Sequence, residues 1–277
     1  MGHVTVDSFQ GHGETVGGGA LYAARTATML GARAAVHTSA ARDPGVSGAL
    51  SGLPVTLIPA AHSTRLDIRY HSDGSRKQTL LAMAGSLSFE QLPDCWREVP
   101  LVHLAPECSE IDTSFLEAMP ESFIGVTAQG WMRRPNEYGE IQYQDWTSSQ
   151  QVLMRADAIV VSEQDVPDAS ILSQWAKHAR NLVITKAHRG CEVYVDRAST
   201  MFHSAAFQPL REQDPTGAGD VFAAAYFWRL FQSRDPVTSA AWANCVASFA
   251  VEGVGTSGIP SLDAVRRRWA ANERLNP

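Results

Sequence analysis

Short apolar runs of four or five residues alternate along most of the chain with longer segments of helical periodicity. Runs of this kind are typical of strands that are buried on both faces, as in a parallel sheet covered by helices. The pattern therefore predicts an α/β fold with a mostly parallel central sheet. The predicted strands are His3–Asp7, Arg33–Ser39, Val55–Pro59, Leu101–Ala105, Phe123–Val126, Ala158–Val161 and Leu182–Thr185.

Helical patterns are clearest near the two ends of the chain. An alanine-rich helix is predicted over Ala20–Leu30, where Gly31 ends it, and a short helix near Val46–Leu50. From Gly217 onward the sequence is almost entirely helical. Three helices are expected there, one to about Ser233, one from Val237 to Glu252 and one from Leu262 to Glu273. Because no linker or repeat interrupts the pattern, we expect a single domain over residues 1–277.

Two regions depart from the alternation of strands and helices. Thr64–Tyr70 and Lys77–Met83 flank Asp73-Gly74, and a turn of this type between two alternating runs predicts a β-hairpin. A hairpin inserted in an α/β chain is often a flap over a site. The second region, Arg133–Trp146, is polar and aromatic, and we predict a loop there.

Composition and charge exclude several classes of protein. The 23 basic and 29 acidic residues give a net charge of −6, which argues against a nucleic-acid-binding protein. The four cysteines are widely spaced, as in a reduced cytosolic protein, and no apolar run approaches the roughly 20 residues that span a bilayer. No signal-peptide pattern and no HxH or HExxH grouping is present. We therefore expect a cytoplasmic protein without a membrane partner or a transition-metal site.

The stretch DPTGAGD, Asp214–Asp220, stands directly before a long apolar run. The first N–H groups of a helix lack partners within the helix, and glycines at 217 and 219 leave them uncovered, which favours an anion site. Asp220 would repel a bound phosphate, but it is well placed to take a proton from a hydroxyl that attacks the phosphate. The alternative is that Thr216 or Asp220 only caps the helix.

The heptapeptide closely resembles the C-terminal signature of the ribokinase (PfkB) family of sugar, polyol and nucleoside kinases. A second stretch, ETVGGGALYAARTATMLGARAAVHTSA, is similar to that family's glycine pair, helix and strand. The resemblance extends from GHVTVD to GTSGIP, almost the whole chain. It implies a ribokinase-like three-layer α/β/α sandwich with a small β lid. It also implies ATP-dependent transfer of the γ-phosphoryl group to a hydroxyl of a small sugar or polyol.

The resemblance assigns roles to individual positions on the acceptor side. Asp220 matches the catalytic base, and Gly217, Ala218 and Gly219 match the anion hole. Tyr22 stands where the family usually has Asn, so one acceptor contact is expected to differ. The residues implied to contact the acceptor are Asp7, Gly17, Gly18, Tyr22, Pro106, Gln129 and Arg133. For Asp7 the alternative is a turn residue at the end of a strand.

On the donor side the resemblance implies contacts to ATP and Mg²⁺. Ser162 and Asp165, in VVSEQDV, replace the family's N-x-x-E motif, and Asp165 could still hold a magnesium-bound water. The implied nucleotide-binding residues are Ser162, Asp165, Thr185, Lys186, Gly190, Asn244, Gly253 and Gly255. The alternatives are an ordinary surface lysine at 186 and a solvent-facing helix residue at 244. Asp214 and Thr216 fall where some members bind a monovalent cation.

A lid over the acceptor is implied at residues 8–16 and 61–85, where it would exclude water from the reaction. The alternative is that the hairpin is only a surface decoration. Lids often pair between subunits in relatives, so a homodimer through the lid is also an expectation. Gln129 in QGWMR, together with DPTGAGD, looks more like the inositol-kinase branch. Because GHVTVD corresponds to the end of the family's first strand, either that strand is short here or the start site is misassigned.

Other functions stay open at this point. One is a catalytically weak, ribokinase-fold regulatory protein that binds a nucleotide or sugar, since the N-x-x-E stretch is altered. The retained Asp220 argues against a pure binding protein. Another is a nucleoside kinase of the same family. A dinucleotide-dependent oxidoreductase and a P-loop kinase are disfavoured, because neither GxGxxG after the first strand nor GxxxxGK[ST] is present.

Overall fold

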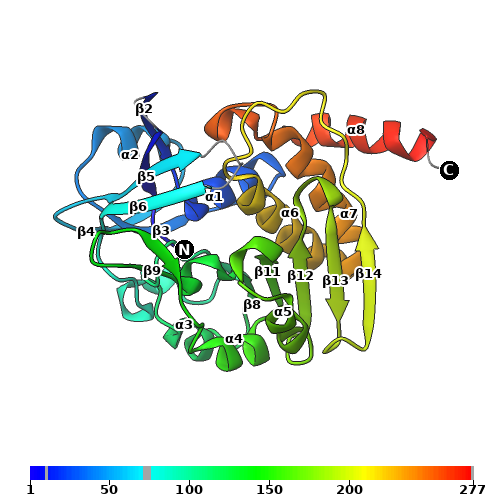
Figure 1. The fold of residues 1–277 in the computed structure, drawn as a ribbon, viewed down its shortest axis with the longest axis horizontal. Helices are drawn as coiled ribbons and strands as arrows, with labels where there is room; N and C mark the ends of the chain where they lie inside the picture. Colours follow the sequence, from blue (N-terminus) through cyan, green and yellow to red (C-terminus); the bar gives the residue numbers. More distant parts are fainter. Residues whose placement is uncertain (10–11, 71–75, 276–277) are drawn as a thin grey trace.

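The computed structural model describes residues 1–9, 12–70 and 76–275, and it has three layers, with helices on both faces of a central sheet (Figure 1). The six strands of that sheet lie in the order β14-β13-β12-β11-β8-β7. The four from β12 to β7 are parallel, whereas β13 and β14 are antiparallel additions. Their bounds are β7 (Leu101–Leu104), β8 (Phe123–Thr127), β11 (Ala158–Ser162), β12 (Asn181–Thr185), β13 (Cys191–Val195) and β14 (Thr200–Ser204).

The apolar strands fill two separate cores, one on each face. In β11, Ile159 and Val161 belong to one core and Ala158 and Val160 to the other, as period-two alternation requires. The first core lies under the helices α3 (Ser114–Ala118), α4 (Ser149–Arg155) and α5 (Ala169–Ala176). The second lies under α6 (Ala218–Ser233) and α7 (Pro236–Ala250), and α8 (Leu262–Leu275) packs on α7. The predicted mostly parallel, doubly covered sheet is therefore confirmed.

Gly125 in β8 sets the distance between the sheet and α6. A Cβ atom at this position would lie 2.5 Å from the ring of Phe227, so the aromatic side chain occupies the space that the glycine leaves. Phe227 is 1% exposed and belongs to the core shared with α7. The helix that begins at DPTGAGD is thereby packed directly onto the sheet.

Residues 1–4 continue the central layer beyond β7. The N–H of Ala105 donates to the carbonyl of Met1 at 2.9 Å, and the N–H of Gly2 donates to the carbonyl of His37 at 3.2 Å. His37 belongs to β3, so this segment lies between β7 and the parallel pair β3–β4. The elements on this side are α1 (Gly19–Met29), β3 (Val36–Ala40), α2 (Pro44–Ala49) and β4 (Val55–Pro59).

A second sheet has the order β2-β1-β5-β6, and we call it the lid sheet. Its strands are β1 (Thr5–Phe9), β2 (His12–Gly17), β5 (Thr64–Tyr70) and β6 (Arg76–Ala82). Figure 1 shows it on the opposite side of the molecule from α8. The predicted strand over His3–Asp7 is corrected, because the regular strand is Thr5–Phe9 and it pairs within the lid sheet. The strands of the predicted hairpin are confirmed, and Asp73-Gly74 lies outside the described residues.

The prediction of a loop over Arg133–Trp146 is wrong in part. β9 (Arg133–Pro135) and β10 (Ile141–Tyr143) form an antiparallel hairpin that reaches the lid sheet. The N–H of Leu80 donates to the carbonyl of Gly139 at 2.8 Å, and Lys77 forms an ion pair with Glu140. Strands of three residues carry too little pattern to be read from sequence, and these depend on the lid sheet for support.

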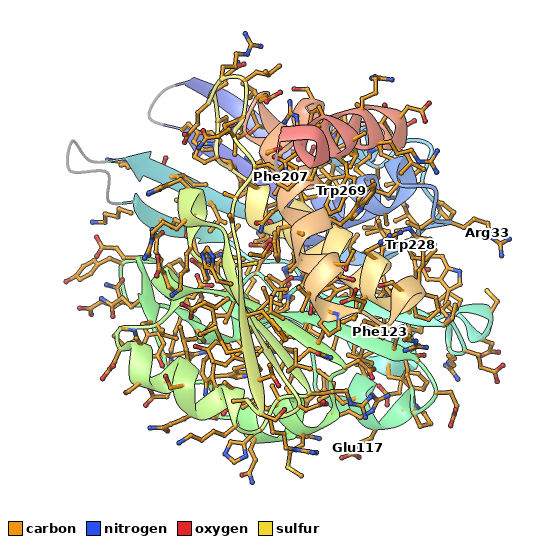
Figure 2. All side chains as sticks on the ribbon, turned by 90° about the vertical axis from the view of Figure 1, so that its right-hand side faces the viewer. Arg33, Glu117, Phe123, Phe207, Trp228 and Trp269 are labelled. Carbon is orange, nitrogen blue, oxygen red and sulfur yellow. The ribbon has the colours of Figure 1, made fainter. Side chains whose placement is uncertain are left out.

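The segment between β14 and α6 crosses the outside of the helical layer. Phe207 in this segment stacks on Trp269 of α8, with ring centroids 5.8 Å apart (Figure 2). Short 3₁₀ helices complete the chain at η1 (Phe89–Gln91), η2 (Asp94–Trp96), η3 (Ala128–Met132), η4 (Glu163–Asp165), η5 (Ala187–Arg189) and η6 (Gly255–Gly258). In the part of the chain that is described, no helix combines the length and apolar character that a bilayer crossing requires.

Candidate active site

The N-terminus of α6 forms the centre of the candidate site. Gly217 caps the helix with φ 77°, in the left-handed region that favours glycine, and a Cβ atom there would lie 2.4 Å from the ring of Tyr22. Gly219 is exposed, and a Cβ atom on it would have no atom within 4 Å. Glycines at 217 and 219 place no side chain over the first turn of this 16-residue helix, which lies at the positive end of the helix dipole. The N–H of Ala218 also donates to the Pro215 carbonyl at 3.2 Å.

Two carboxylates approach each other at Gly19, the first residue of α1. A Cβ atom on Gly19 would lie 2.9 Å from Asp220 Oδ1 and 3.5 Å from Glu107 Oε1. The N–H of Gly19 also donates to Glu107 Oε1 at 2.6 Å. The bare backbone of this glycine thus leaves room beside the predicted base.

Glu107 is a candidate functional residue to which the sequence analysis assigned no role. Its Oε2 lies 3.5 Å from a guanidinium nitrogen of Arg133, and the two side chains are 14% and 12% exposed. Burial raises the pKa of Glu107 to about 8; Arg133 lowers it and the neighbouring Asp220 raises it. Its position just beyond β7 was the available signal, because ligands of α/β proteins bind at the carboxyl ends of parallel strands.

The glycine pair holds the other predicted acceptor residues in place. Asp7 in β1 is 5% exposed, and a Cβ atom on Gly17 would lie 2.6 Å from its Oδ2. Gly18 has φ 93° and packs against the carbonyl of His3, where a Cβ atom would lie at 2.5 Å. Asp7 is therefore buried in the lid sheet, within a strand rather than at a strand-end turn.

Tyr22 is enclosed by the carboxylates of the site. It is 4% exposed, and burial raises the pKa of its hydroxyl, followed by the negative charges of Asp220, Asp214, Asp7 and Glu107. The ring packs beneath Gly217. The ring of Tyr22 therefore supports residues 217–219, which we call the anion loop.

Gln129 and Asp165 join the acceptor side to the donor side. Gln129 Nε2 donates to Asp165 Oδ1 at 2.5 Å, and the N–H of Ser162 donates to Asp165 Oδ2 at 2.8 Å. Gly130 lets this segment approach the loop after β7, since a Cβ atom would lie 2.0 Å from the carbonyl oxygen of Pro106. The structure thus brings together residues predicted for two different ligands.

The residues present fit Mg²⁺ held through water rather than directly. Both oxygens of Asp165 already accept hydrogen bonds within the chain. Across residues 1–9, 12–70 and 76–275, no group of three or more His, Cys, Asp or Glu side chains could hold a metal ion. This fits a cation that arrives with the phosphates of the donor, as hard divalent cations commonly do.

The predicted donor residue Lys186 and its neighbour Arg189 both form ion pairs within the chain. Lys186 pairs with Glu192, and Arg189 pairs with Glu163. The Lys186 side chain is 19% exposed, less than an ordinary surface lysine. Gly190 closes the turn with φ 87°, where a Cβ atom would lie 2.1 Å from a backbone carbonyl oxygen.

Asn244 lies inside the protein between α7 and β14. It is 7% exposed, and its Nδ2 donates to the Ser204 carbonyl at 3.2 Å and to Ser204 Oγ at 3.0 Å. The alternative of a solvent-facing residue is therefore wrong. Thr185, at the end of β12, donates through its hydroxyl to the Val161 carbonyl at 3.4 Å.

The residues predicted for a monovalent cation lie beside the anion loop. The N–H of Asp214 donates to the carbonyl of Val251 at 3.2 Å, and Asp214 Oδ1 accepts the N–H of Thr216 at 2.9 Å. Gly255 has φ 57°, and a Cβ atom on it would lie 4.0 Å from the Tyr22 hydroxyl. Gly253 packs closely on Gly258 in the same turn; a Cβ atom there would lie 2.8 Å from the Gly258 nitrogen.

One segment of the chain matches a known protein family. Residues 155–262, which include DPTGAGD and α7, match the family described as pfkB family carbohydrate kinase. This part of the chain therefore resembles the pfkB carbohydrate kinases, which are phosphotransferases that have an alcohol group as acceptor. No curated protein matches the chain.

Solved structures confirm the ribokinase-like fold of the chain. A pyrophosphate-dependent ribokinase-family kinase, complexed with a pyrophosphate analog and myo-inositol, superimposes with a TM-score of 0.78 at 22% identity, covering 95% of this chain and 98% of that one. A Burkholderia thailandensis nucleoside kinase in complex with inosine gives 0.77 at 15% identity, covering 97% and 96%. Arabidopsis thaliana ribokinase complexed with ribose and ATP gives 0.73 at 13%, covering 96% and 95%.

Proposed function

We propose that this chain phosphorylates a hydroxyl of a small cyclic polyol of the inositol class, with Asp220 as the general base. The observation that carries the proposal is the pairing of Asp220 with the uncovered first turn of α6, beside the open backbone of Gly19. The carboxylate that would deprotonate the acceptor hydroxyl thus lies beside the N–H groups that would bind the phosphoryl group. The resemblance in fold to a kinase bound to myo-inositol supports the acceptor class.

In the proposed reaction the acceptor hydroxyl points at Asp220, which removes its proton as the oxygen attacks the terminal phosphorus of the donor. The bond that forms joins the acceptor oxygen to phosphorus, and the bond that breaks joins phosphorus to the bridging oxygen of the leaving phosphate. The N–H groups of residues 217–219 hold the negative charge on the transferred group. Mg²⁺ bound with the donor would supply further charge neutralisation through its water, close to Asp165.

Glu107 and Arg133 are proposed to orient the acceptor ring. The carboxylate is held by the Gly19 N–H at 2.6 Å and lies 3.5 Å from the guanidinium. Both side chains can hydrogen-bond to ring hydroxyls, Arg133 as a donor and Glu107 as an acceptor. Asp7 offers a further carboxylate from the lid sheet. A polyol with several hydroxyls suits this set better than an acceptor with one.

The phosphoryl donor is proposed to be ATP, as the sequence resemblance implies. Leu210 and Val254 expose 87% and 49% of their surface, and both lie close to Glu252, whose carboxylate accepts the N–H of Leu210. Exposed apolar side chains of this kind suit an adenine base. Pyrophosphate is the second candidate, because pyrophosphate-dependent kinases share the fold at TM-scores of 0.77 and 0.78. Each donor would compete with Glu192 and Glu163 for the paired cations.

The lid sheet is proposed to cover the acceptor and exclude water. Two observations support this proposal: Asp7, a predicted acceptor contact, belongs to β1 of this sheet, and the β9–β10 hairpin, which begins at Arg133, hydrogen-bonds to β6 of the same sheet. The single-domain organisation and a cytoplasmic location remain predictions of the sequence pattern and composition. A monovalent cation and a homodimer through the lid remain predictions of the resemblance. A regulatory binding protein is disfavoured. A carboxylate beside an anion site weakens the binding of an anion, so we expect one there only if it serves as a base.

An activity assay that detects the phosphorylated product directly tests the proposal. Purified protein is incubated with myo-inositol, other cyclic polyols, pentoses, hexoses and nucleosides, each with ATP or with pyrophosphate, and phosphorylated product is detected by mass spectrometry. Turnover is expected with a cyclic polyol and at least one donor. Binding of donor without transfer to any acceptor would overturn the kinase proposal and favour the regulatory alternative.

A further inference from the structure

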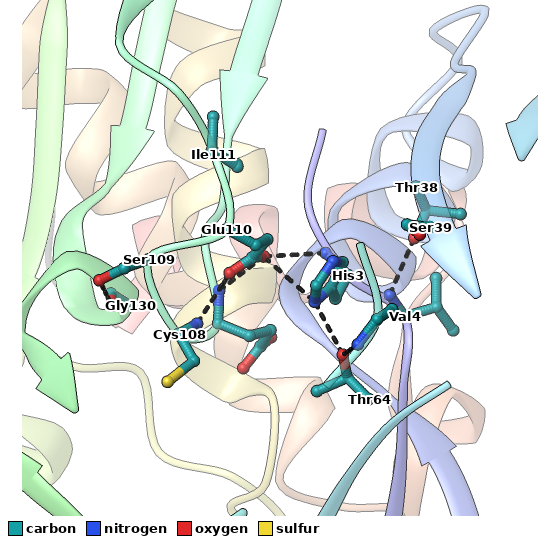
Figure 3. A network of polar contacts seen from close by, with 12 residues as sticks. His3, Val4, Thr38, Ser39, Thr64, Cys108, Ser109, Glu110, Ile111 and Gly130 are labelled. Carbon is teal, nitrogen blue, oxygen red and sulfur yellow. Dashed lines mark hydrogen bonds and ion pairs between the residues drawn. The ribbon is translucent and has the colours of Figure 1, made fainter. Parts of the chain in front are cut away.

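A polar network with a buried centre links the loop that carries Glu107 to the lid sheet (Figure 3). Its centre is formed by His3, which is 0% exposed, and Glu110, which is 1% exposed. The mechanism proposed above uses neither residue. Burying ionisable side chains is costly unless hydrogen bonds compensate, so the arrangement of their partners shows what the network holds.

Glu110 fixes the loop that carries Glu107. The N–H of Glu107 donates to both oxygens of Glu110, at 2.9 Å each, and the N–H of Cys108 donates to Oε2 at 2.8 Å. The N–H of His3 donates to Oε1 at 3.0 Å. Three backbone groups therefore converge on one carboxylate, and two of them belong to the loop at the acceptor site.

His3 extends the network to the lid sheet. Its Nε2 donates to the carbonyl oxygen of Gly85 at 2.8 Å, because a carbonyl oxygen only accepts. Its Nδ1 lies 2.7 Å from the Thr64 hydroxyl oxygen and 4.0 Å from Glu110 Oε1. Thr64 Oγ1 in turn accepts the N–H of Ala84 at 3.1 Å. Thr64 begins β5, and Ala84 and Gly85 follow β6, so these are the two points where the β5–β6 hairpin joins the body.

We propose that His3 and Glu110 are positioning residues that couple the lid hinge, Thr64 and Ala84–Gly85, to the orientation of Glu107. The inference rests on the proposed kinase function. A displacement of the hinge moves the imidazole, whose own backbone N–H is bound to Glu110, and Glu110 holds the backbone of Glu107. Directional hydrogen bonds transmit such a displacement more specifically than apolar contacts, because each has one preferred geometry.

Hydrogen–deuterium exchange tests the coupling without requiring activity. Glu110→Gln puts an amide group against the converging N–H groups, and we expect at least tenfold faster exchange at residues 82–87 as well as at 105–110. Thr64→Val removes one hydroxyl with little change of shape and should speed exchange in the same two segments. Thr64→Ser keeps the hydroxyl and should behave as wild type. If each substitution loosens only its own segment, the proposal is overturned.

Ser122→Ala is the matched control for the loss of a buried hydroxyl. Ser122 is 6% exposed, and its hydroxyl donates to the Val99 carbonyl at 2.6 Å, at the opposite end of the strands. This variant should leave both segments unchanged. If it loosens them as much as Thr64→Val does, the effect is general destabilisation and the coupling is refuted.

Kinetics provide the second readout. Thr64→Val should raise the KM for the acceptor about tenfold and increase the fraction of donor hydrolysed by water, with an unchanged KM for the donor, and Thr64→Ser should restore both. An unaltered acceptor KM and hydrolysis fraction would overturn the proposal. If the wild-type protein phosphorylates no acceptor, the kinase function fails, whereas the exchange experiment still decides the coupling.

Discussion

The acceptor side and the donor side of the candidate site treat charge in opposite ways. On the acceptor side, Asp220 and Glu107 meet around Gly19, and the guanidinium of Arg133 lies 3.5 Å from Glu107. On the donor side, Lys186 and Arg189 each form an ion pair with a glutamate. The acceptor side places carboxylates close together in a largely buried space. On the donor side, the cations are neutralised by ion pairs within the protein.

This difference teaches how one site can serve two ligands of unlike charge. Clustered buried carboxylates bind protons more tightly than isolated ones, which suits a neutral polyol whose hydroxyl must lose a proton. The raised pKa of Glu107 is the clearest sign of this. Paired cations, in contrast, would stabilise the donor side in the absence of ligand, and in the proposed reaction a polyphosphate would replace the glutamates as their partner.

The largest expected effect comes from breaking the acceptor side at its base. Asp220→Asn keeps the shape but cannot accept a proton, so turnover should fall roughly 10²–10⁴-fold. Donor binding, measured by titration calorimetry, should stay unchanged. Asp263→Asn, at an exposed helix position, serves as the control. Turnover near the wild-type rate would show that Asp220 is not the base.

The next effect concerns the anion loop between the two sides. Gly219→Val places a side chain where no atom now lies within 4 Å, over the first turn of α6, so the fold should survive. Turnover should fall about 10²-fold, as when one donor of an anion hole is lost. Gly48→Val, in α2, also meets no atom within 4 Å and is the matched control. Equal activities of the two variants would contradict an anion site at this helix end.

A third experiment sharpens the charge difference through pH. The folded protein raises the pKa of Glu107 to about 8 from an ordinary 4.5, so between these values it holds a proton that the unfolded chain releases. Wild-type stability should therefore fall as pH rises through this window, relative to Glu107→Gln, by at most about 1.4 kcal/mol per pH unit.

Urea unfolding at pH 5, 6, 7 and 8 measures this dependence. Glu137→Gln, at an exposed position of the β9–β10 turn, is the control and should follow wild type. The Glu107→Gln substitution should also raise the acceptor KM about tenfold. A stability difference that is constant with pH would mean that Glu107 titrates normally.

The smallest effects are expected on the donor side. Lys186→Ala should raise the KM for the donor about three- to tenfold, corresponding to about 1 kcal/mol, and leave the acceptor KM unchanged. Glu192→Gln frees the lysine and should lower the donor KM by a similar factor. Initial-rate kinetics with ATP and with pyrophosphate measure both. If Lys186→Ala and Glu192→Gln shift the donor KM in the same direction, the proposed exchange of Glu192 for the donor phosphates is refuted.

Local patterns predicted the parts of the fold that local forces decide. The buried strands and the helix that follows DPTGAGD were readable because apolar periodicity and glycines act over a few residues. The role of Glu107 was not, since its contact with Gly19 joins positions 88 residues apart. The burial of Asn244 depends likewise on Ser204, 40 residues earlier. The β9–β10 hairpin forms because its turn meets β6, which no local pattern records.

The aromatic ring of Phe227 over Gly125 has a consequence for how such an enzyme diversifies. Because the ring rests on bare backbone, α6, which carries it, is held at one distance from the sheet, and the N-terminal turn of α6 is held with it. Selection for new acceptors is then expected to act on the loops around this fixed point. A larger residue at position 125 would displace the N-terminal end of α6, and a different ligand could not compensate for that displacement.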